Sequence, residues 1–262
     1  MNVTASSRAS NQPAAKTVGL FAIIALAYVL DDLLHEFGHA AATLLPIGVK
    51  AVSISTIGLS TMGSSAIVAI AGPLVNFALA AALLFARVPR LSPAWRYFLW
   101  LFGTVNLFNA TAYLFYSAVL GSGDWATVFN AVAAPVYWRP LAGLVGIVLY
   151  RAAIRASCGV LHGLCSSGVI ATSNAGRYCI HAYWVGGIVI TAGSLLNPVS
   201  PWFILTSGAA TGFGAMLGLL ELPPLLRRLH ATAGSPNESL RMGLPWIMAG
   251  IIARRFQGSR AT

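Results

Sequence analysis

The sequence predicts an all-α fold, a polytopic bundle of about six transmembrane helices. Hydrophobic residues make up 57% of the 262 residues and charged residues only 8%, whereas about 25% of residues are charged in an ordinary globular protein. The apolar residues come in blocks of about 20, which is long enough for a helix to cross a bilayer. They do not alternate with polar residues, as they would in the strands of a membrane barrel. A soluble domain, a disordered chain and a disulfide scaffold are therefore excluded as descriptions of this chain.

The apolar blocks define the expected elements in order. Residues 1–17 are polar and are expected to form a disordered tail. Six blocks predict transmembrane helices, over about 18–45, 64–85, 97–120, 140–161, 183–196 and 202–226. The fifth block is short for a span, and the stretch 125–138, shorter still than a usual span, suits a re-entrant or interfacial segment. Residues 231–262 form a basic tail, in which 240–253 resemble a helix lying on the membrane surface.

The net charge of +10 does not point to nucleic acid, because the basic residues lie at the ends of the apolar blocks. With the N-terminus inside and six spans, 14 of the 16 basic residues fall on the cytoplasmic side, and only Lys50 and Arg139 fall opposite. This asymmetry predicts a multi-pass protein of the bacterial cytoplasmic (inner) membrane, surrounded by the lipid bilayer, with both termini in the cytoplasm. The oligomeric state does not follow from these features.

The first apolar block contains His35-Glu36-Phe37-Gly38-His39. On a helix His39 lies about 40° round from His35 and one turn further along, so both imidazoles can reach one metal ion. Glu36 lies about 100° round, where it can take a proton from a metal-bound water and return it to a leaving amine. Asp32 falls on the same face and is expected to accept a hydrogen bond from an imidazole. These polar groups would cost several kcal/mol each if buried without a ligand, so the pattern predicts a metal site.

This pattern resembles the site-2 protease family of intramembrane zinc metalloproteases. A second segment, Ala71-Gly72-Pro73-Leu74-Val75-Asn76, is similar to that family's A-G-P-x-x-N signature. The resemblance covers about residues 18–125 and implies a three-helix metalloprotease core there, with residues 126–230 as additional transmembrane helices. It also implies one Zn²⁺ ion held by His35 and His39, with Glu36 as the general base.

The family's third zinc ligand is an Asp after the third core helix, usually in an N-x-x-P-x-x-x-L-D-G context. This chain differs, because Asn106 and Asn109 are followed by no proline and by a longer gap to Asp124. Asp124 is still the only acid in that region, and its neighbouring glycines allow the backbone to turn it towards a metal. The alternative is an ordinary turn residue in water.

Helix direction provides a separate reason to expect these residues together. His35 lies about 25 Å along the first helix, the A-G-P-x-x-N segment begins the returning helix, and Asp124 follows the end of the third. All three pieces therefore reach the same side of the membrane. Asn76 and Asn109 are expected either to hydrogen-bond the backbone of a substrate or to bond between helices.

The sequence thus predicts a zinc metalloprotease that hydrolyses peptide bonds in or near a transmembrane segment of a membrane-protein substrate. Two alternatives remain: a catalytically inactive relative that binds a client helix, and a membrane protein that uses the His/Asp cluster to move ions or protons.

The charge count places the site towards the extracytoplasmic face, whereas family members are better known for cutting near the cytosolic side. Either this chain is inverted or the span count differs by one. Cys158, His162 and Cys165 share a helix face, and their ordinary interpretation is packing.

Overall fold

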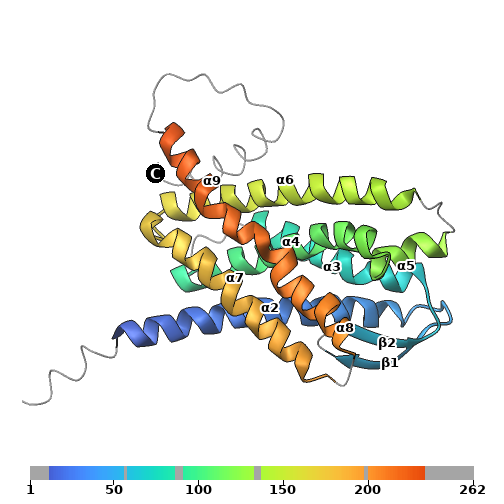
Figure 1. The fold of residues 1–262 in the computed structure, drawn as a ribbon. Helices are drawn as coiled ribbons and strands as arrows, with labels where there is room; N and C mark the ends of the chain where they lie inside the picture. The colour runs from blue at the N-terminus through green and yellow to red at the C-terminus, as the bar shows by residue number, and fades with distance from the viewer. Residues whose placement is uncertain (1–11, 56–57, 86–90, 133–136, 198–199, 234–262) are drawn as a thin grey trace, which may run out of the picture.

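The predicted fold class is confirmed in the computed structural model of the chain (Figure 1). The structure describes residues 12–55, 58–85, 91–132, 137–197 and 200–233. Within that part of the chain, six helical segments are long and apolar enough to cross a membrane. Five of them are the regular helices α2 (Gln12–Ala42), α3 (Ala66–Phe85), α4 (Pro93–Leu120), α6 (Trp138–Ser166) and α7 (Thr172–Leu195).

The sixth span changes its helical type along its length. The short helix α8 (Pro201–Phe203) precedes it. The span begins as the π-helix η1 (Ile204–Gly214), continues as the 3₁₀ turn η2 (Ala215–Leu217) and ends within α9 (Gly218–Ala233). Such a long π-helical segment is unusual, because π geometry occurs mostly as single turns. Tyr150 of α6 stabilises the junction with α9, since its hydroxyl donates to the Ala215 carbonyl at 2.6 Å and accepts from the Gly218 N–H at 2.7 Å.

Several helix boundaries differ from those predicted, and among the helix starts those of α2 and α7 differ most. Helix α2 begins at Gln12 rather than near residue 18, and Pro13 suits its first turn because proline is tolerated there. Helix α7 begins at Thr172 and has 24 residues, so the prediction of a short fifth span was wrong. Its first turns are polar, and a boundary drawn from apolar residues alone leaves them out. The disordered tail predicted over residues 1–17 was wrong for 12–17, which belong to α2. Residues 1–11 and the predicted surface helix at 240–253 lie outside the described residues.

A β-hairpin that the sequence analysis did not predict connects α2 to α3. Strand β1 (Lys50–Ser55) pairs antiparallel with β2 (Gly58–Met62), so that Lys50 lies opposite Met62 and Ser55 opposite Gly58. The pairing is irregular between Ala51 and Ser53. The hairpin lies at the end of the bundle where α2 finishes (Figure 1). The segment 125–138, predicted as re-entrant or interfacial, contains most of the short helix α5 (Asp124–Ala131) at the same end.

Helix α4 is the most buried of the six spans and packs against α2, α3 and α6. Its aromatic residues Trp100 and Phe108 are fully buried, together with Tyr28 of α2 and Ile154 of α6. The Trp100 indole N–H also donates to the Ser157 carbonyl of α6 at 3.1 Å, which satisfies its one polar atom inside the bundle. Helix α4 therefore holds the predicted core, α2 to α4, in contact with the additional helices.

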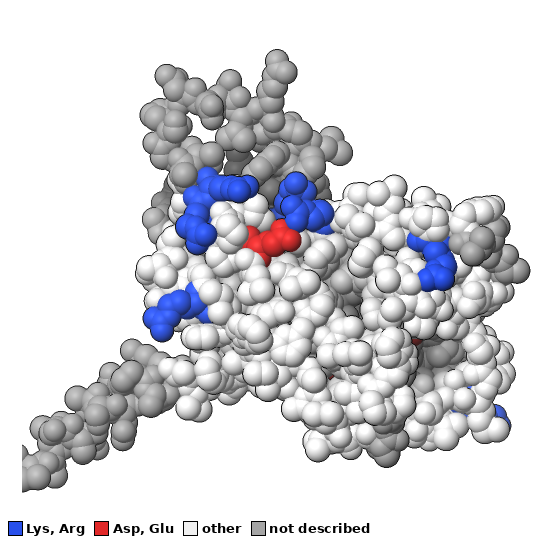
Figure 2. All heavy atoms as spheres, viewed as in Figure 1, with Lys and Arg blue, Asp and Glu red and all other residues white. Residues whose placement is uncertain are grey.

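Basic side chains gather around the end of the bundle where α6 and α9 finish (Figure 2). Lys50, at the start of β1, and Arg139, in the first turn of α6, lie at the opposite end. Arg139 has a structural role there, because its guanidinium donates to the carbonyls of Ala118 and Val119 in the last turn of α4. Cations next to the last carbonyls of a helix satisfy acceptors that have no partner within the helix. Among the residues that the structure describes, the basic side chains therefore keep the asymmetry used to predict the orientation.

Candidate metal centre

The two histidines of α2 and Asp124 meet at one point in the bundle. The Nε2 atoms of His35 and His39 are 3.1 Å apart, and each lies 3.2 Å from Oδ2 of Asp124. Both imidazoles are buried. Over the described part of the chain, this is the group of three or more His, Cys, Asp or Glu side chains that is close enough to hold a metal ion.

Glycine residues in the turn after α4 bring Asp124 to this point. Gly121 ends the helix with φ of 66°, and Gly123 precedes α5 with φ of 86°. Both values lie in the left-handed region, which glycine adopts readily and other residues rarely do. A Cβ on Gly123 would also lie only 2.8 Å from the Tyr113 hydroxyl, which accepts a hydrogen bond from the Asp124 N–H at 3.4 Å. The Gly-rich turn therefore directs Asp124 back towards α2.

The hydrogen bond between His39 and the Val68 carbonyl determines the tautomer of the His39 ring. Its Nδ1 lies 2.6 Å from the Val68 carbonyl of α3, and a carbonyl can only accept, so Nδ1 carries the proton. The Gly72 N–H lies 3.4 Å from the same nitrogen, a longer contact that does not compete with the carbonyl. In the neutral ring, the Nε2 lone pair is left pointing towards His35 and Asp124.

The tautomer of His35 is set through a chain of side chains. Its Nδ1 lies 2.7 Å from Oδ1 of Asn76. The Asn76 amide can be oriented in only one way, because its Nδ2 donates to Oδ1 of Asp31 at 2.6 Å. The other Asp31 oxygen accepts from Asn109 Nδ2 at 2.9 Å. Three buried side chains, one each from α2, α3 and α4, thus hold the His35 ring with Nε2 available as a ligand.

The spacing of the three atoms fits a zinc ion. Nitrogen and oxygen ligands lie about 2.0–2.2 Å from zinc, so ligands at tetrahedral angles are roughly 3.3 Å from one another. The three observed separations are 3.1, 3.2 and 3.2 Å. A shared proton can bridge two of these atoms but not all three. Two imidazoles and one carboxylate, with a fourth position open, are also a donor set typical of catalytic zinc sites.

The charge on Asp124 suits the same interpretation. Burial disfavours the ionised form of its carboxyl group, but hydrogen bonds from Nε2 of His35 and His39, when these nitrogens carry protons, outweigh burial and lower its pKa below the ordinary value. The carboxyl group is therefore ionised at neutral pH. An ionised carboxylate is the form that binds a metal.

Gly72, in the segment similar to A-G-P-x-x-N, provides the space in which the imidazoles meet. A Cβ at this position would lie 2.4 Å from Nε2 of His39 and 2.8 Å from Nε2 of His35. Gly38 has a related role within the first motif, since its Cβ would lie 2.9 Å from the Ala71 carbonyl. These two glycines allow α2 and α3 to approach closely, as small residues do between membrane helices.

Glu36 lies beside the cluster, as the helical spacing predicted, and its side chain is buried. The backbone of Leu59 in β2 hydrogen-bonds to its carboxylate, while Oε2 has no hydrogen-bond partner among the described residues. Glu36 and His35 line a recess of about 40 Å³, and a cavity of more than about 15 Å³ can hold a water molecule. The arrangement places a carboxylate, a candidate metal position and room for a water side by side.

The carboxylate connected to His35 is Asp31, which the sequence analysis did not single out. Asp32, which was expected to accept from an imidazole, lines the same recess and makes no hydrogen bond to a ring in the described structure. Asp31 precedes His35 by four residues and Asp32 by three, so both lie on the face of His35 and helical spacing does not separate them. The i, i+4 relation was nevertheless a signal that would have included Asp31. The amide groups of Asn76 and Asn109 bond between helices, which is one of the two roles expected for them.

The other candidate metal ligands do not form a comparable group. Cys158, Cys165 and Cys179 are free and buried, and His162 packs against His230 with ring centroids 4.7 Å apart. Glu221 pairs with Arg151 of α6, away from the candidate centre.

Comparisons of the chain with protein-family models, with curated proteins and with solved structures find no match. The geometry of the candidate centre is therefore the feature from which a function of this chain can be inferred.

Proposed function

We propose that this protein is an intramembrane zinc metalloprotease, the activity implied by its resemblance to the site-2 protease family. One observation carries the proposal: Nε2 of His35, Nε2 of His39 and Oδ2 of Asp124 form a triangle with sides of 3.1–3.2 Å. This triangle lies within a bundle of six candidate membrane spans. The motif residues and Asp124 come from segments almost 90 residues apart in sequence, so chance proximity in one helix does not account for the cluster.

The chain's own residues supply the remaining parts of a hydrolytic mechanism. A zinc ion bound here would lower the pKa of a bound water to about 7 and polarise the scissile carbonyl. Glu36 accepts a proton from the attacking water and later returns it to the nitrogen of the leaving amine. Asn76 and Asp31 keep His35 in the tautomer that presents Nε2, and the Val68 carbonyl does the same for His39.

The position of the cluster favours cleavage near the end of a substrate's membrane segment. His35 and His39 lie in the last turns of α2, which ends at Ala42, and the β-hairpin follows directly. A substrate helix must unwind before it can be cut, because its carbonyls are otherwise engaged in its own hydrogen bonds. Unwinding is easier near the membrane surface, where water can satisfy the released backbone groups.

The test compares wild type with Glu36→Gln, both purified in detergent, for zinc content and for cleavage of a panel of single-span membrane proteins. We expect both proteins to bind about one zinc per chain, and only the wild type to cleave. Glu221→Gln is the matched control, since it makes the same chemical change at a half-exposed carboxylate paired with Arg151. It should cleave as the wild type does.

The other outcomes separate the alternative functions. Zinc bound by both proteins without cleavage by either would favour an inactive relative that binds a client helix. Equal cleavage by wild type and Glu36→Gln would remove the protease proposal. Transport of ions or protons that depends on the His/Asp cluster, measured in liposomes, would favour the third function.

A further inference from the structure

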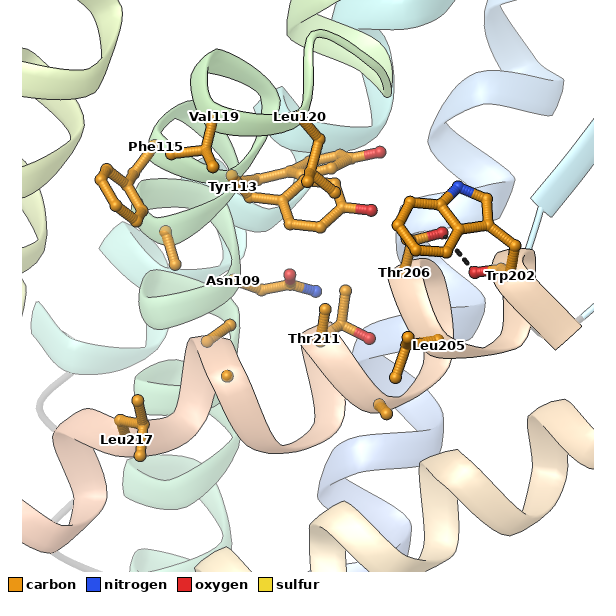
Figure 3. Close-up of a pocket in the computed structure, with 16 residues that line it drawn as sticks. Asn109, Tyr113, Phe115, Val119, Leu120, Trp202, Leu205, Thr206, Thr211 and Leu217 are labelled. Atoms are coloured by element: carbon orange, nitrogen blue, oxygen red, sulfur yellow. Dashed lines mark hydrogen bonds between the residues drawn. The ribbon is translucent and has the colours of Figure 1, made fainter.

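A groove runs between α4 and the sixth span beside the candidate centre (Figure 3). Its volume is about 540 Å³, within the range of about 300–1,000 Å³ found for ligand pockets. Tyr113, Phe115 and Leu120 of α4 face Trp202 of α8 and Leu205 and Leu217 of the sixth span across it. The surface of the groove is therefore almost entirely apolar.

The groove adjoins the recess at the candidate centre. Asn109, Tyr113, Thr206 and Thr211 line both cavities, and the recess is also lined by His35 and Glu36. A molecule whose reacting bond lies at Glu36 would therefore extend its neighbouring groups into the apolar groove.

We propose that the groove binds large apolar side chains next to the scissile bond of the substrate, and this rests on the proposed function. A whole membrane helix, about 10 Å across and 30 Å long, is far too large for it. An unwound segment is extended, so it directs successive side chains to opposite sides and can insert a few of them while its backbone passes the centre. The substrate class is thus a membrane segment with bulky apolar residues beside the cut.

The inner end of the groove favours a polypeptide over the acyl chain of a lipid. The Thr211 hydroxyl donates to the carbonyls of Ser207 and Gly208 within η1, so it presents an acceptor to the groove. A peptide N–H can use that acceptor, whereas a hydrocarbon chain cannot. The groove thus offers apolar walls to side chains and a polar inner end to a backbone.

Small residues of η1 create the hollow, and one of them permits a clean test. A Cβ added to Gly214 meets no atom within 4 Å, and its backbone angles, φ −63° and ψ −53°, are ordinary helical values. A larger side chain at this position therefore enters the groove without straining the fold. Gly193 in α7 is the matched control, because its Cβ also meets nothing and it does not line the groove.

The experiment compares wild type, Gly214→Leu and Gly193→Leu on single-span substrates that carry either Leu or Ala beside the cut. The wild type and Gly193→Leu should prefer the Leu substrate. In Gly214→Leu, the ratio of kcat/KM for the Leu substrate to kcat/KM for the Ala substrate should fall by about 10-fold or more, the range for misfit in an apolar pocket. Zinc content should stay unchanged, and cleavage of the Ala substrate should fall less than cleavage of the Leu substrate.

A second measurement identifies the occupant without cleavage. A photoreactive side chain replaces Leu217, which lines the groove, in the Glu36→Gln protein, and cross-linked products are identified by mass spectrometry. Cross-links to the substrate support the proposal, and cross-links to phospholipid alone overturn it. An unchanged substrate preference in Gly214→Leu also overturns it, while the proposed function survives. If the wild type cleaves nothing in a zinc-dependent manner, both proposals are lost.

Discussion

Gly72 has no side chain, and this leaves the space in which the imidazoles of His35 and His39 can share one ion. Its Cα faces the point where Nε2 of His35 and Nε2 of His39 meet, and any Cβ there would overlap them. The A-G-P-x-x-N-like segment therefore acts on the centre through steric space as well as through the amide of Asn76. Its residues shape a site to which none of them contributes a ligand.

Gly72→Ala should bind zinc much more weakly while the helical bundle remains folded. Its Cβ would displace both rings, so the loss should exceed the roughly 10–100-fold that removal of an outer hydrogen-bond partner costs. Zinc affinity measured by competition with a chelator checks this, with circular dichroism as the test of folding. Gly193→Ala, where the Cβ meets nothing, should bind zinc normally. Normal zinc affinity in Gly72→Ala would show that the rings adopt other positions.

Asp31 and Asp32 are adjacent, but only Asp31 holds the Asn76 and Asn109 amides. Asp31→Asn replaces an acceptor that serves two donors with an amide that has only one acceptor oxygen, so His35 should lose its orientation. Zinc affinity should fall by about 10–100-fold in Asp31→Asn and by much less in Asp32→Asn. Competition measurements on both variants decide the matter. The opposite order would favour Asp32 as the partner of the imidazoles, as the sequence analysis expected.

Among the elements, the sixth span differs most from regular helical geometry, and this shapes the groove beside the centre. The π-helical segment η1 provides the small residues and hydroxyls of one wall, and α4 provides the other. Where η2 meets α9, the Tyr150 hydroxyl bridges a carbonyl and an N–H of the backbone. That single hydroxyl links α6 to the irregular part of the sixth span.

Tyr150→Phe should destabilise the protein by about 1–3 kcal/mol, because it leaves the Ala215 carbonyl and the Gly218 N–H without their partner. Unfolding in mixed micelles measures this change in the free energy of unfolding. Tyr137→Phe is a suitable control, since the Tyr137 side chain is 67% exposed and should contribute little. Equal stabilities of the two variants would mean that the junction does not depend on this bridge.

At the scale of the whole molecule, an even number of spans places the described ends of the chain together and the candidate centre opposite them. The basic residues gather at the end where α6 and α9 finish (Figure 2), and such residues favour the cytoplasmic side. The centre should therefore face away from the cytoplasm. The six candidate spans agree with the count from which this orientation was predicted.

Cysteine labelling in intact cells tests the orientation. The three native cysteines are buried, so their background reaction should be low. A membrane-impermeant maleimide should label Lys50→Cys, in the hairpin beside the centre, from outside the cell. Arg227→Cys, near the end of α9, should react only after the membrane is permeabilised. Labelling of Arg227→Cys but not Lys50→Cys from outside would show that the protein has the opposite orientation, with the centre at the cytoplasmic face.

The sequence alone was enough to predict the span count and to bring His35, His39 and Asp124 to one side of the membrane. Both predictions depend on quantities that are local to the chain. The length of an apolar block determines whether a helix crosses the bilayer, and the number of crossings determines on which side each loop emerges. The β-hairpin was missed because its strands are short and mostly exposed, so no buried face marks them in the sequence.

The tertiary structure decided everything that depends on how the helices are rotated against one another. The choice of Asp31 over Asp32 in the hydrogen-bond network, the space left by Gly72 and the groove between α4 and η1 are of this kind. Each requires atoms from segments far apart in sequence to lie within a few ångströms. Helical periodicity places Asp31 about 40° to one side of His35 and Asp32 about 60° to the other, so it does not choose between these carboxylates, and it does not place a cavity.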